Sequence, residues 1–583
     1  MNDTTLYLRK IFVSSRFSGI LLSTRTSHES VRFDLLIVAT WIKFTFFLFN
    51  FLLLLILSPC TLESFFFPHS KEYLYKSVEA SRYAEKKKKN HIHARMVGGA
   101  SDIDKRNRIK LATWNCESKG VSFLSSQKSF LSVKYRVLTI MENLKRKLED
   151  YGQEHLLQYW DQLSQEERDV LEKEILELDL VELTSYYDRA TSSLSTVKNK
   201  LDDKIQPIPE NNIVSGEACT KEELKMYNSL GLQEVADGRV AVLLLAGGQA
   251  ERIRRLETLA EKYWGKKGEI IWYIMTSEAT HDSTIIFLRE NDYFGLKEKN
   301  VMAFKQGMLP CFTLNGKIIL DEKHKISRAP DGNGGLYKAL KVQGVLDDMV
   351  QRGIRSIHVH SVDNILVKVA DPIFLGYCLS VSTDCGVKVI EKSSPSEPVG
   401  VVCKVDDHYQ VVEYSEISKD TAELRQDDGR LVFNAANICN HYFTVDFLLA
   451  LGNKYEASME LHAAKKKIPY IDDNGKKCTP ISPNGIKIEK FVFDVFKFAK
   501  NFAAWQGIRE EEFSPLKNSD SAKQDCPSTA RRDLLWLHKK WLLNAGAQKI
   551  NGDVEVSPLR SYAGENLTNI AQDQSFEGPT VIE

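Results

Sequence analysis

The sequence lacks several features that would indicate a simple functional class. Its 78 basic and 78 acidic residues balance, so bulk charge gives no reason to expect a nucleic-acid partner. The ten cysteines form no CxxC pair and the thirteen histidines form no HExxH motif, which argues against a zinc site. Scattered cysteines are typical of a reducing compartment, so we expect a cytoplasmic protein.

The first 140 residues lack the composition of an ordinary soluble domain. Residues 35–57 are almost entirely apolar and long enough to span a bilayer, although Lys43 opposes insertion. The run also begins late for a signal peptide. Two interpretations stay open: a membrane anchor, or translated non-coding sequence in front of a true start at Met141. We therefore expect 1–140 to be an extension, with membrane association only if the apolar run is genuine.

From Met141 the chain has the pattern of a soluble protein. Apolar residues recur at helical spacing, and Ser164 with Glu167 predicts a capping box at the start of an amphipathic helix. The polar stretch 192–218, which contains two prolines, is interpreted as a linker. Residues 141–238 are thus expected to be a helical region followed by that linker.

Strands and helices alternate from Val240 onward. The apolar run 240–245 predicts a buried strand, Gly247 and Gly248 a tight turn, and residues 250–264 a helix with an apolar face. That face is formed by Ile253, Leu256, Leu259, Ala260 and Tyr263. The alternation predicts an α/β fold, with a doubly wound, mostly parallel, Rossmann-like sheet over 239–515 and a small C-terminal domain over 516–583.

Two polar motifs stand where such a sheet binds its ligands, beyond the carboxyl ends of strands. In "APDGNGG", Asn333 can donate and accept hydrogen bonds, as recognition of a base or an acetamido sugar requires, although a plain tight turn is an alternative. Asp363 follows the apolar strand in "IHVHSVD". Its carboxylate suits Mg²⁺ shared with substrate phosphates, or it simply caps the next turn.

Weaker candidates come from isolated strings. Glu413 and Tyr414 in "EYSEI" could bind sugar hydroxyls or could lie at a strand edge. Lys487 and Lys517 occur in loops marked by glycine or proline, where an ammonium group can act as a point charge for phosphate. The alternative for both lysines is ordinary solvation.

Taken together, these strings resemble the eukaryotic UDP-N-acetylglucosamine pyrophosphorylases. The resemblance runs from about Met141 to the C-terminus and includes "GQEHLLQYW", "LLLAGGQ", "QGMLP", "SVDNILVKVADP", "FNAANICNHYF", "PNGIKIEKFVFD", "EFSPLKNSDS" and "SYAGE". It implies a nucleotidyltransferase that joins UTP to N-acetylglucosamine 1-phosphate and releases pyrophosphate, with Mg²⁺ as cofactor. Oligomeric state stays open, and the C-terminal part from "LLWLHKKWLLNAGAQ" onward could help to form a homodimer.

The resemblance implies roles for residues at matching positions. The expected uridine contacts are Leu245, Ala246, Gly247, Gly248, Gln306 and Gly332. The expected contacts to the amino sugar are Asn333, Glu413, Tyr414 and Asn437, and Ala436 stands where the family usually has glycine. The groups expected around the phosphates and the metal are Asp363, which would bind Mg²⁺, and the catalytic lysines Lys487 and Lys517.

One departure from the family affects activity. The family signature continues from its two glycines into a third glycine, an arginine and a Pro-Lys pair, whereas here "LLLAGGQ" runs directly into "AERIRRLE". Arg252 is a poor substitute because it lies in the following helix, away from Ile253 and Leu256. The gap has the clean edges that a skipped exon would leave. We therefore expect this chain to have little or no pyrophosphorylase activity. A non-catalytic protein that binds UDP-sugars is the alternative.

Overall fold

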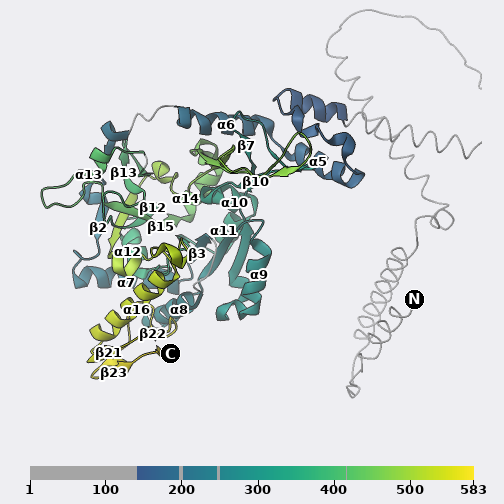
Figure 1. Cartoon of the computed structure of the whole chain (residues 1–583). Coiled ribbons are helices and arrows are strands. Elements are labelled where there is room, and N and C mark those ends of the chain that lie inside the picture. The colour runs from purple at the N-terminus through teal and green to yellow at the C-terminus, as the bar shows by residue number, and fades with distance from the viewer. Residues whose placement is uncertain (1–140, 196–200, 246–249, 415) are drawn as a thin grey trace, which may run out of the picture. The chain divides into compact units, whose positions relative to one another are not determined.

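The computed structural model describes residues 141–195, 201–245, 250–414 and 416–583 (Figure 1). The apolar run 35–57 lies outside these residues, and so does the turn 246–249 with the expected uridine contacts Ala246, Gly247 and Gly248. Within the described ranges, no helix combines the length and apolar character needed to cross a membrane.

The central element is an eleven-stranded sheet in the order β2-β20-β12-β15-β11-β3-β4-β5, with β13 attached to β15 and flanked by β1 and β14. Along this order all neighbours run parallel except β15, which is antiparallel to both β11 and β12. The predicted α/β fold with a mostly parallel sheet and an antiparallel insertion is therefore confirmed. The strands are β1 Ile205–Gln206, β2 Ile213–Ser215, β3 Val240–Leu245, β4 Ile271–Thr276, β5 Val301–Lys305, β11 Ser356–Ser361, β12 Cys385–Glu391, β13 Val401–Val405, β14 His408–Val412, β15 Ala435–Thr444 and β20 Phe502–Gly507.

Both faces of the sheet are covered, which is why strands such as β3 are continuous apolar runs. Alternate residues of β3 enter opposite cores, Leu243 on one face and Val242 on the other. On the Leu243 face lie α10 Leu336–Val342, α11 Val345–Gln351 and α14 Val445–Ala450. On the Val242 face lie α7 Lys221–Ala236, α8 Ala250–Trp264 and α12 Pro372–Ser380. The remaining longer helices are α5 Gln165–Glu177, α6 Leu180–Ser195, α9 His281–Glu290 and α16 Pro527–Asn544.

Local sequence signals explain where two helices begin. The helix α8 starts at Ala250, directly after the turn 246–249, and buries Ile253, Leu256 and Ala260 as predicted. Tyr263 was expected on the same face but is 48% exposed, because the buried contacts of α8 end at Ala260. The capping box of α5 is also present: the Glu167 N–H donates to Ser164 Oγ at 3.3 Å, and the Ser164 N–H donates to Glu167 Oε2 at 2.8 Å.

Smaller units flank the sheet. The helices α5 and α6 pack on short strands in a separate core. Those strands include β6 Met308–Pro310, β7 Phe312–Thr313, β8 Leu320–Glu322, β9 Lys325–Ile326, β10 Arg328–Pro330, β16 His462–Lys466 and β19 Gly485–Glu489. The C-terminal region joins α16 to β21 Lys549–Asn551, β22 Val554–Val556, β23 Ser575–Glu577 and β24 Thr580–Ile582 in another core (Figure 1). The predicted boundaries at 140, 238 and 515 stay predictions.

Three histidines are buried inside the central sheet. His358 and His360 lie on β11, and His441 lies on β15. Burial lowers the pKa of His441 to about 3 and that of His360 to about 4, and it also lowers the pKa of His358. Neither ring nitrogen of His441 has a hydrogen-bond partner among the described residues. The folded state therefore keeps these rings neutral at pH values where an unfolded chain would protonate them.

This arrangement predicts acid-sensitive folding. Because these pKa values lie below the unfolded value of about 6.5, their contribution to stability is complete above that pH. It declines below that pH by about 1.4 kcal/mol per pH unit for each histidine, until the folded pKa is reached. Urea unfolding at pH 7.5, 6.0 and 5.0 measures this slope. The variant His441→Phe removes the two unpaired nitrogens, so we expect a shallower slope; a slope equal to that of the exposed control His408→Gln would contradict this assignment.

Candidate active site

The carboxyl ends of neighbouring parallel strands meet at one edge of the sheet. Leu245 at the end of β3 is level with Ser361 at the end of β11. Gln306 follows β5, and its N–H donates to the carbonyl oxygen of Thr276 at the end of β4 at 2.8 Å. Asp363 comes two residues after β11. The structure therefore brings three of the predicted contacts, from three separate strands, to this edge.

The Gly332 turn packs against the chain that follows β19. Gly332 has φ +86°, and a Cβ there would lie 2.3 Å from the Lys490 carbonyl oxygen. That oxygen accepts the Gly334 N–H at 2.8 Å. The side-chain oxygen of Asn333 accepts the Val492 N–H at 2.9 Å. Only glycine fits such a backbone contact at this φ.

Asp331 lies beneath this turn and was not singled out from the sequence. It is 4% exposed, and a Cβ at Gly335 would lie 1.9 Å from its Oδ1 and one at Gly307 would lie 2.4 Å from its Oδ2. Burial raises the pKa of Asp331 to about 6, against the opposing charge of Lys490. Its carboxyl group thus packs against Gly307 and Gly335, and the Asp331 N–H donates to the Gly307 carbonyl oxygen at 3.1 Å, which links the chain after Gln306 to the Gly332 turn. The only sequence signal was its place in the string "APDGNGG".

Asn437 and Glu413 flank Gly400. The Asn437 N–H donates to the Gly400 carbonyl oxygen at 2.9 Å, and a Cβ at Gly400 would lie 3.0 Å from Glu413 Oε1. A bulge in β15 follows Asn437, where Cys439 has φ +51° and donates its N–H to Asn437 Oδ1 at 3.2 Å. Bulges re-aim side chains and are common next to active sites, and this one directly follows Asn437 in an interior strand of the sheet.

Lys517 and Asp363 form the charged part of the site. Lys517 Nζ lies 3.9 Å from Asp363 Oδ2, and the lysine side chain is 51% exposed, so solvent screens this ion pair strongly. Backbone contact supports it, since the Leu516 N–H donates to the Asp363 carbonyl oxygen at 2.8 Å. Burial raises the pKa of Cys439 to about 12, and the charges of Asp363 and Lys517 both act on that thiol. The charged pair therefore lies beside the Asn437 bulge.

Lys487 and Tyr414 are placed differently from the others. Lys487 lies within β19 rather than in a loop, which corrects the sequence interpretation. It shares a strand face with Glu489, whose Cβ would be 3.1 Å from a Cβ at Gly332. No carboxylate of the described residues forms an ion pair with Lys487. Tyr414 is 54% exposed, and within the described part of the chain no hydrogen bond joins it to the other predicted residues.

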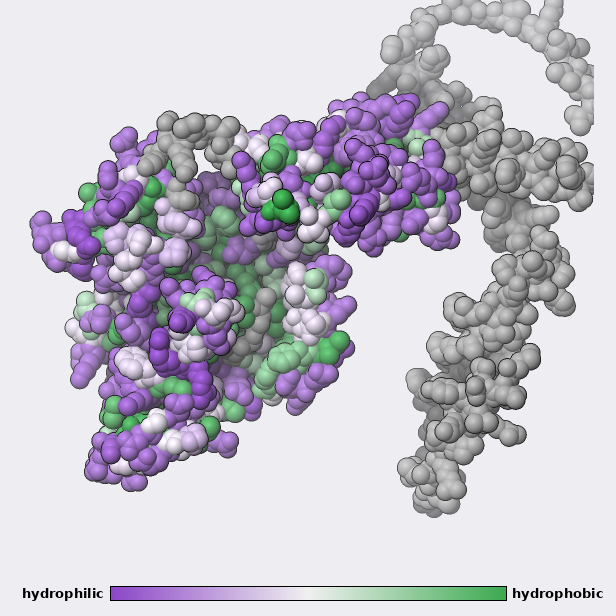
Figure 2. Space-filling view, viewed as in Figure 1, coloured by the Kyte–Doolittle hydropathy of each residue, from purple (hydrophilic) through white to green (hydrophobic). Residues whose placement is uncertain are grey.

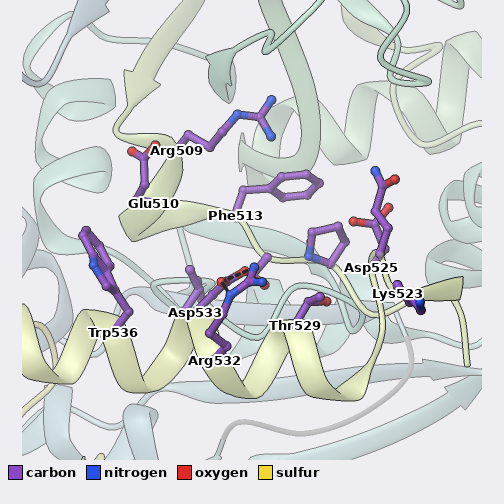
Figure 3. A pocket seen from close by; sticks show the side chains of 13 residues that line it. Arg509, Glu510, Phe513, Lys523, Asp525, Thr529, Arg532, Asp533 and Trp536 are labelled. Carbon is purple, nitrogen blue, oxygen red and sulfur yellow. Dashed lines mark hydrogen bonds and ion pairs between the residues drawn. The ribbon is translucent and has the colours of Figure 1, made fainter. Parts of the chain in front are cut away.

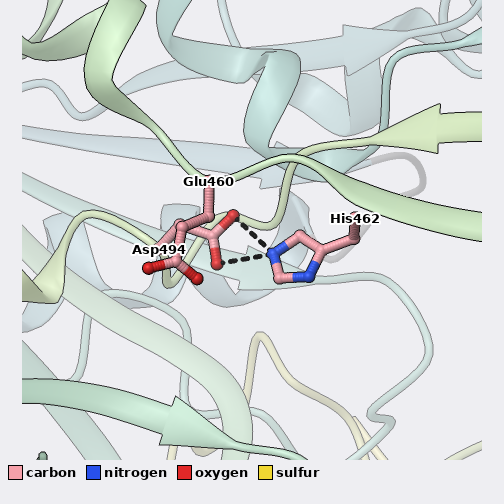
Figure 4. Close-up of side chains that lie close together, drawn as sticks. All are labelled: Glu460, His462 and Asp494. Atoms are coloured by element: carbon pink, nitrogen blue, oxygen red, sulfur yellow. Dashed lines mark hydrogen bonds and ion pairs between the residues drawn. The ribbon is translucent and has the colours of Figure 1, made fainter. Parts of the chain in front are cut away.

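His462 and Asp494 lie close by, and neither was singled out from the sequence (Figure 4). His462 Nε2 is 3.0 Å from Asp494 Oδ1 and 3.1 Å from Oδ2. The imidazole stacks on the Phe491 ring with 4.0 Å between centroids, and the Phe491 N–H donates to Asp494 Oδ2 at 2.8 Å. The one available signal was the family string that ends in "FVFD", which contains Asp494.

Arg252 is not free to replace the absent arginine of the family signature. It was expected on the side of its helix away from Ile253 and Leu256. The structure shows its side chain 8% exposed, with the guanidinium group donating to the carbonyl oxygens of Val367 and Ile365. Because its guanidinium group already donates to these backbone oxygens, Arg252 is not available to bind a triphosphate.

Figure 2 shows a hollow with apolar residues on its floor in the face that is viewed. A separate cavity of about 470 Å³ lies beside α16, with Arg509, Phe513 and Trp536 among its lining residues (Figure 3). None of the predicted site residues lines that cavity. It adjoins the site through Asp525, whose carbonyl oxygen accepts the Lys517 N–H at 2.8 Å.

Comparisons with known proteins agree with this geometry. Residues 252–563 match the family model described as UTP–glucose-1-phosphate uridylyltransferase. A UDP-N-acetylhexosamine pyrophosphorylase-like protein 1 from Xenopus tropicalis is 45% identical over 492 residues, covering 76% of this chain and 96% of the relative. The UDP-N-acetylglucosamine diphosphorylase 2 of Arabidopsis thaliana is 38% identical, covering 75% and 93%. The crystal structure of the Trypanosoma brucei uridine diphosphate N-acetylglucosamine pyrophosphorylase superimposes with a TM-score of 0.63 at 28% identity, covering 74% and 94%.

The same comparisons bear on the departure after the glycine turn. The alignment with the Xenopus protein extends over 492 positions but takes in only 76% of the 583 residues here, so about four dozen of its positions have no residue of this chain. The family model begins to match at residue 252, directly behind the turn. The place of these positions along the alignment is not fixed by these numbers, and the missing segment after Gln249 stays a prediction.

The Gly332 turn gives a stability prediction. Gly332→Ala places a methyl group against the Lys490 carbonyl oxygen at a positive φ, whereas Gly344→Ala at φ +71° meets nothing within 4 Å. Both variants pay the backbone cost of about 1 kcal/mol, so the difference between them isolates the clash. In urea titrations, we expect the free energy of unfolding of Gly332→Ala to be at least about 2 kcal/mol lower than that of Gly344→Ala. Equal values would mean that the turn does not pack as described.

Proposed function

The chain belongs to the UTP–glucose-1-phosphate uridylyltransferase family, and we propose that it acts within that family as a UDP-N-acetylglucosamine pyrophosphorylase. Its substrates would be UTP and N-acetylglucosamine 1-phosphate, and its products UDP-N-acetylglucosamine and pyrophosphate. The printed names of the Arabidopsis and Trypanosoma proteins support this choice of sugar nucleotide. A cytoplasmic location accords with the free cysteines of the described residues.

The observation that carries the proposal is the convergence of separate strand ends on one site. Gln306 and the Gly332 turn are joined through Asp331 and would face the uracil. Glu413 and Asn437 are joined through Gly400 and would face the acetylated hexose. The pair of Asp363 and Lys517 lies beside the second group, where phosphates would connect the two halves.

The reaction needs alignment and charge stabilisation more than a protein nucleophile. The phosphate oxygen of the sugar attacks the α-phosphorus of UTP, the bond to the β-phosphate oxygen breaks, and pyrophosphate leaves. Lys517 and Lys487 would offset the charge that develops on the phosphate oxygens. Asp363 offers a half-exposed carboxylate, a ligand type suited to Mg²⁺ shared with substrate phosphates, and the ion would supply further charge neutralisation.

We expect the chain to retain affinity for UDP-N-acetylglucosamine while its rate of catalysis is low. The residues proposed for the base and the hexose are present, while the glycine–arginine–lysine segment of the family is not. Losing one preorganised charge contact typically lowers a rate by about 10²–10³-fold. A UDP-sugar-binding protein with little catalysis is therefore kept as the second candidate.

Activity and binding can be measured separately on the same chain. We expect pyrophosphate release from UTP and N-acetylglucosamine 1-phosphate to be at least about 10²-fold slower than with the Arabidopsis diphosphorylase 2 assayed alongside. Calorimetry should still detect binding of UDP-N-acetylglucosamine to the chain. A turnover equal to that of the relative would refute the importance of the missing segment, and absence of both binding and turnover would refute the proposed site.

Lys517 gives a sharper test of the phosphate side. Lys517→Ala should weaken UDP-N-acetylglucosamine binding by about tenfold or more, because an ammonium group is lost beside the phosphates. Lys523→Ala in the same exposed loop is the matched control and should change binding less than about twofold. Titrations in EDTA test the metal. Without the ion, Asp363→Asn should bind UDP-N-acetylglucosamine as tightly as the unchanged chain does. Equal losses in the two lysine variants would remove Lys517 from the site.

A further inference from the structure

The His462–Asp494 pair lies between the two groups of residues expected to contact the amino sugar. On one side, Phe491 stacks on His462, and the next residue, Val492, donates its N–H to Asn333. On the other side, the charge of His462 acts on Glu413 and lowers its pKa, against burial and Glu416, which raise it. His462 is therefore linked to the Asn333 turn by residues 491 and 492, and its charge interacts with that of Glu413.

Negative charge is concentrated around this imidazole. The groups facing it are Glu413, Glu416, Glu460 and Asp494. The ligand-type atoms of Glu460, His462 and Asp494 all lie within 4.8 Å of one another (Figure 4). Two ammonium groups lie nearby, Lys497 at 2.8 Å from Glu460, and Lys517, whose charge acts on Glu413. Without a charge on His462, four carboxylates would face these two cations.

The ring is held in the form that supplies this charge. Burial lowers the pKa of His462, but the hydrogen bond and charge of Asp494, with Glu460 and Glu416, raise it above its ordinary value overall. Asp494 is itself fixed by the Phe491 N–H. The imidazolium is thus fixed in position on one side by stacking and on another by a carboxylate, as a side chain that orients its neighbours should be.

We propose that His462, held by Asp494, is a positioning residue for the hexose half of the site. Its stack on Phe491 fixes the chain that holds Asn333. Its positive charge opposes the effect of burial on Glu413 and so favours the carboxylate form, which can accept hydrogen bonds from sugar hydroxyls. The inference rests on the proposed function, because it assumes that Glu413 and Asn333 contact an amino sugar. It requires that loss of His462 weakens binding of the sugar and leaves binding of the nucleotide unchanged.

Calorimetry with two ligands tests this on the full chain. UDP reports the nucleotide half, and the ratio of UDP-N-acetylglucosamine to UDP affinity reports the hexose half. We expect His462→Gln and His462→Phe to lower that ratio by about tenfold, with UDP affinity changed less than about twofold. His324→Gln is the matched control, because His324 also lies between two glutamates, Glu167 at 3.5 Å and Glu322 at 3.7 Å. This control should leave the ratio unchanged.

A pH series separates charge from structure. Because the pKa of His462 is raised, its charge is present below that pKa and lost above it, so the wild-type ratio should fall as the pH rises through the range above about 6.5, the ordinary histidine value. In His462→Gln the ratio should be lower and independent of pH over this range. Urea unfolding of each variant confirms that it is folded.

Other results would overturn the inference in recognisable ways. An unchanged ratio in both His462 variants, or equal losses for UDP and UDP-N-acetylglucosamine, would reject the positioning role alone. Retained affinity in His462→Phe would show that stacking suffices and that the charge is not needed. If the wild-type chain itself binds the two ligands equally, the hexose site fails and the proposed function fails with it.

Discussion

The site depends on one contact between two pieces of backbone, the packing of the Gly332 turn against Lys490. Gly332 approaches the Lys490 carbonyl oxygen more closely than any Cβ allows, and the Gly334 N–H bonds to the same oxygen. The segment that provides this oxygen continues into Phe491, Val492 and Asp494, which hold His462 and Asn333 in place. The glycines of this motif therefore serve packing first, and the arrangement of the polar groups follows from it.

Much of the sheet could be predicted because its strands and helices carry local signals. The apolar runs of β3 and β4 and the helix α8 have the composition that burial on both sides of a parallel sheet requires. The exposure of Tyr263 and the bulge after Asn437 could not be predicted in this way. Both depend on where a neighbouring element ends, and no periodicity within a single segment contains that information.

The site was predictable to a different extent. Residues that would touch a ligand directly, such as Glu413 and Lys517, could be named from the resemblance because they stand in motifs. Asp331, His462 and Asp494 could not be named in this way. His462 and Asp494 act on each other across a long sequence separation, and Asp331 packs against glycines where its carboxyl group leaves no space for a side chain. Lys487 was assigned to a loop because glycine and proline precede it, yet its backbone pairs with Ala464 in a short antiparallel ladder.

The geometry also limits what the missing segment can affect. Only four residues, 246–249, connect the end of β3 to the start of α8, and a chain of that length spans at most about 14 Å. A connection this short cannot both join the two elements and wrap around a triphosphate. The groups proposed to face the hexose come from residues 306–517, whereas Leu245 at the end of β3 and Ala246, Gly247 and Gly248 of this connection are among those expected to contact the uridine. We therefore expect the missing segment to affect the phosphate end of the nucleotide more than the hexose end, so that recognition of the sugar nucleotide and catalysis of its formation would be separable properties of this chain.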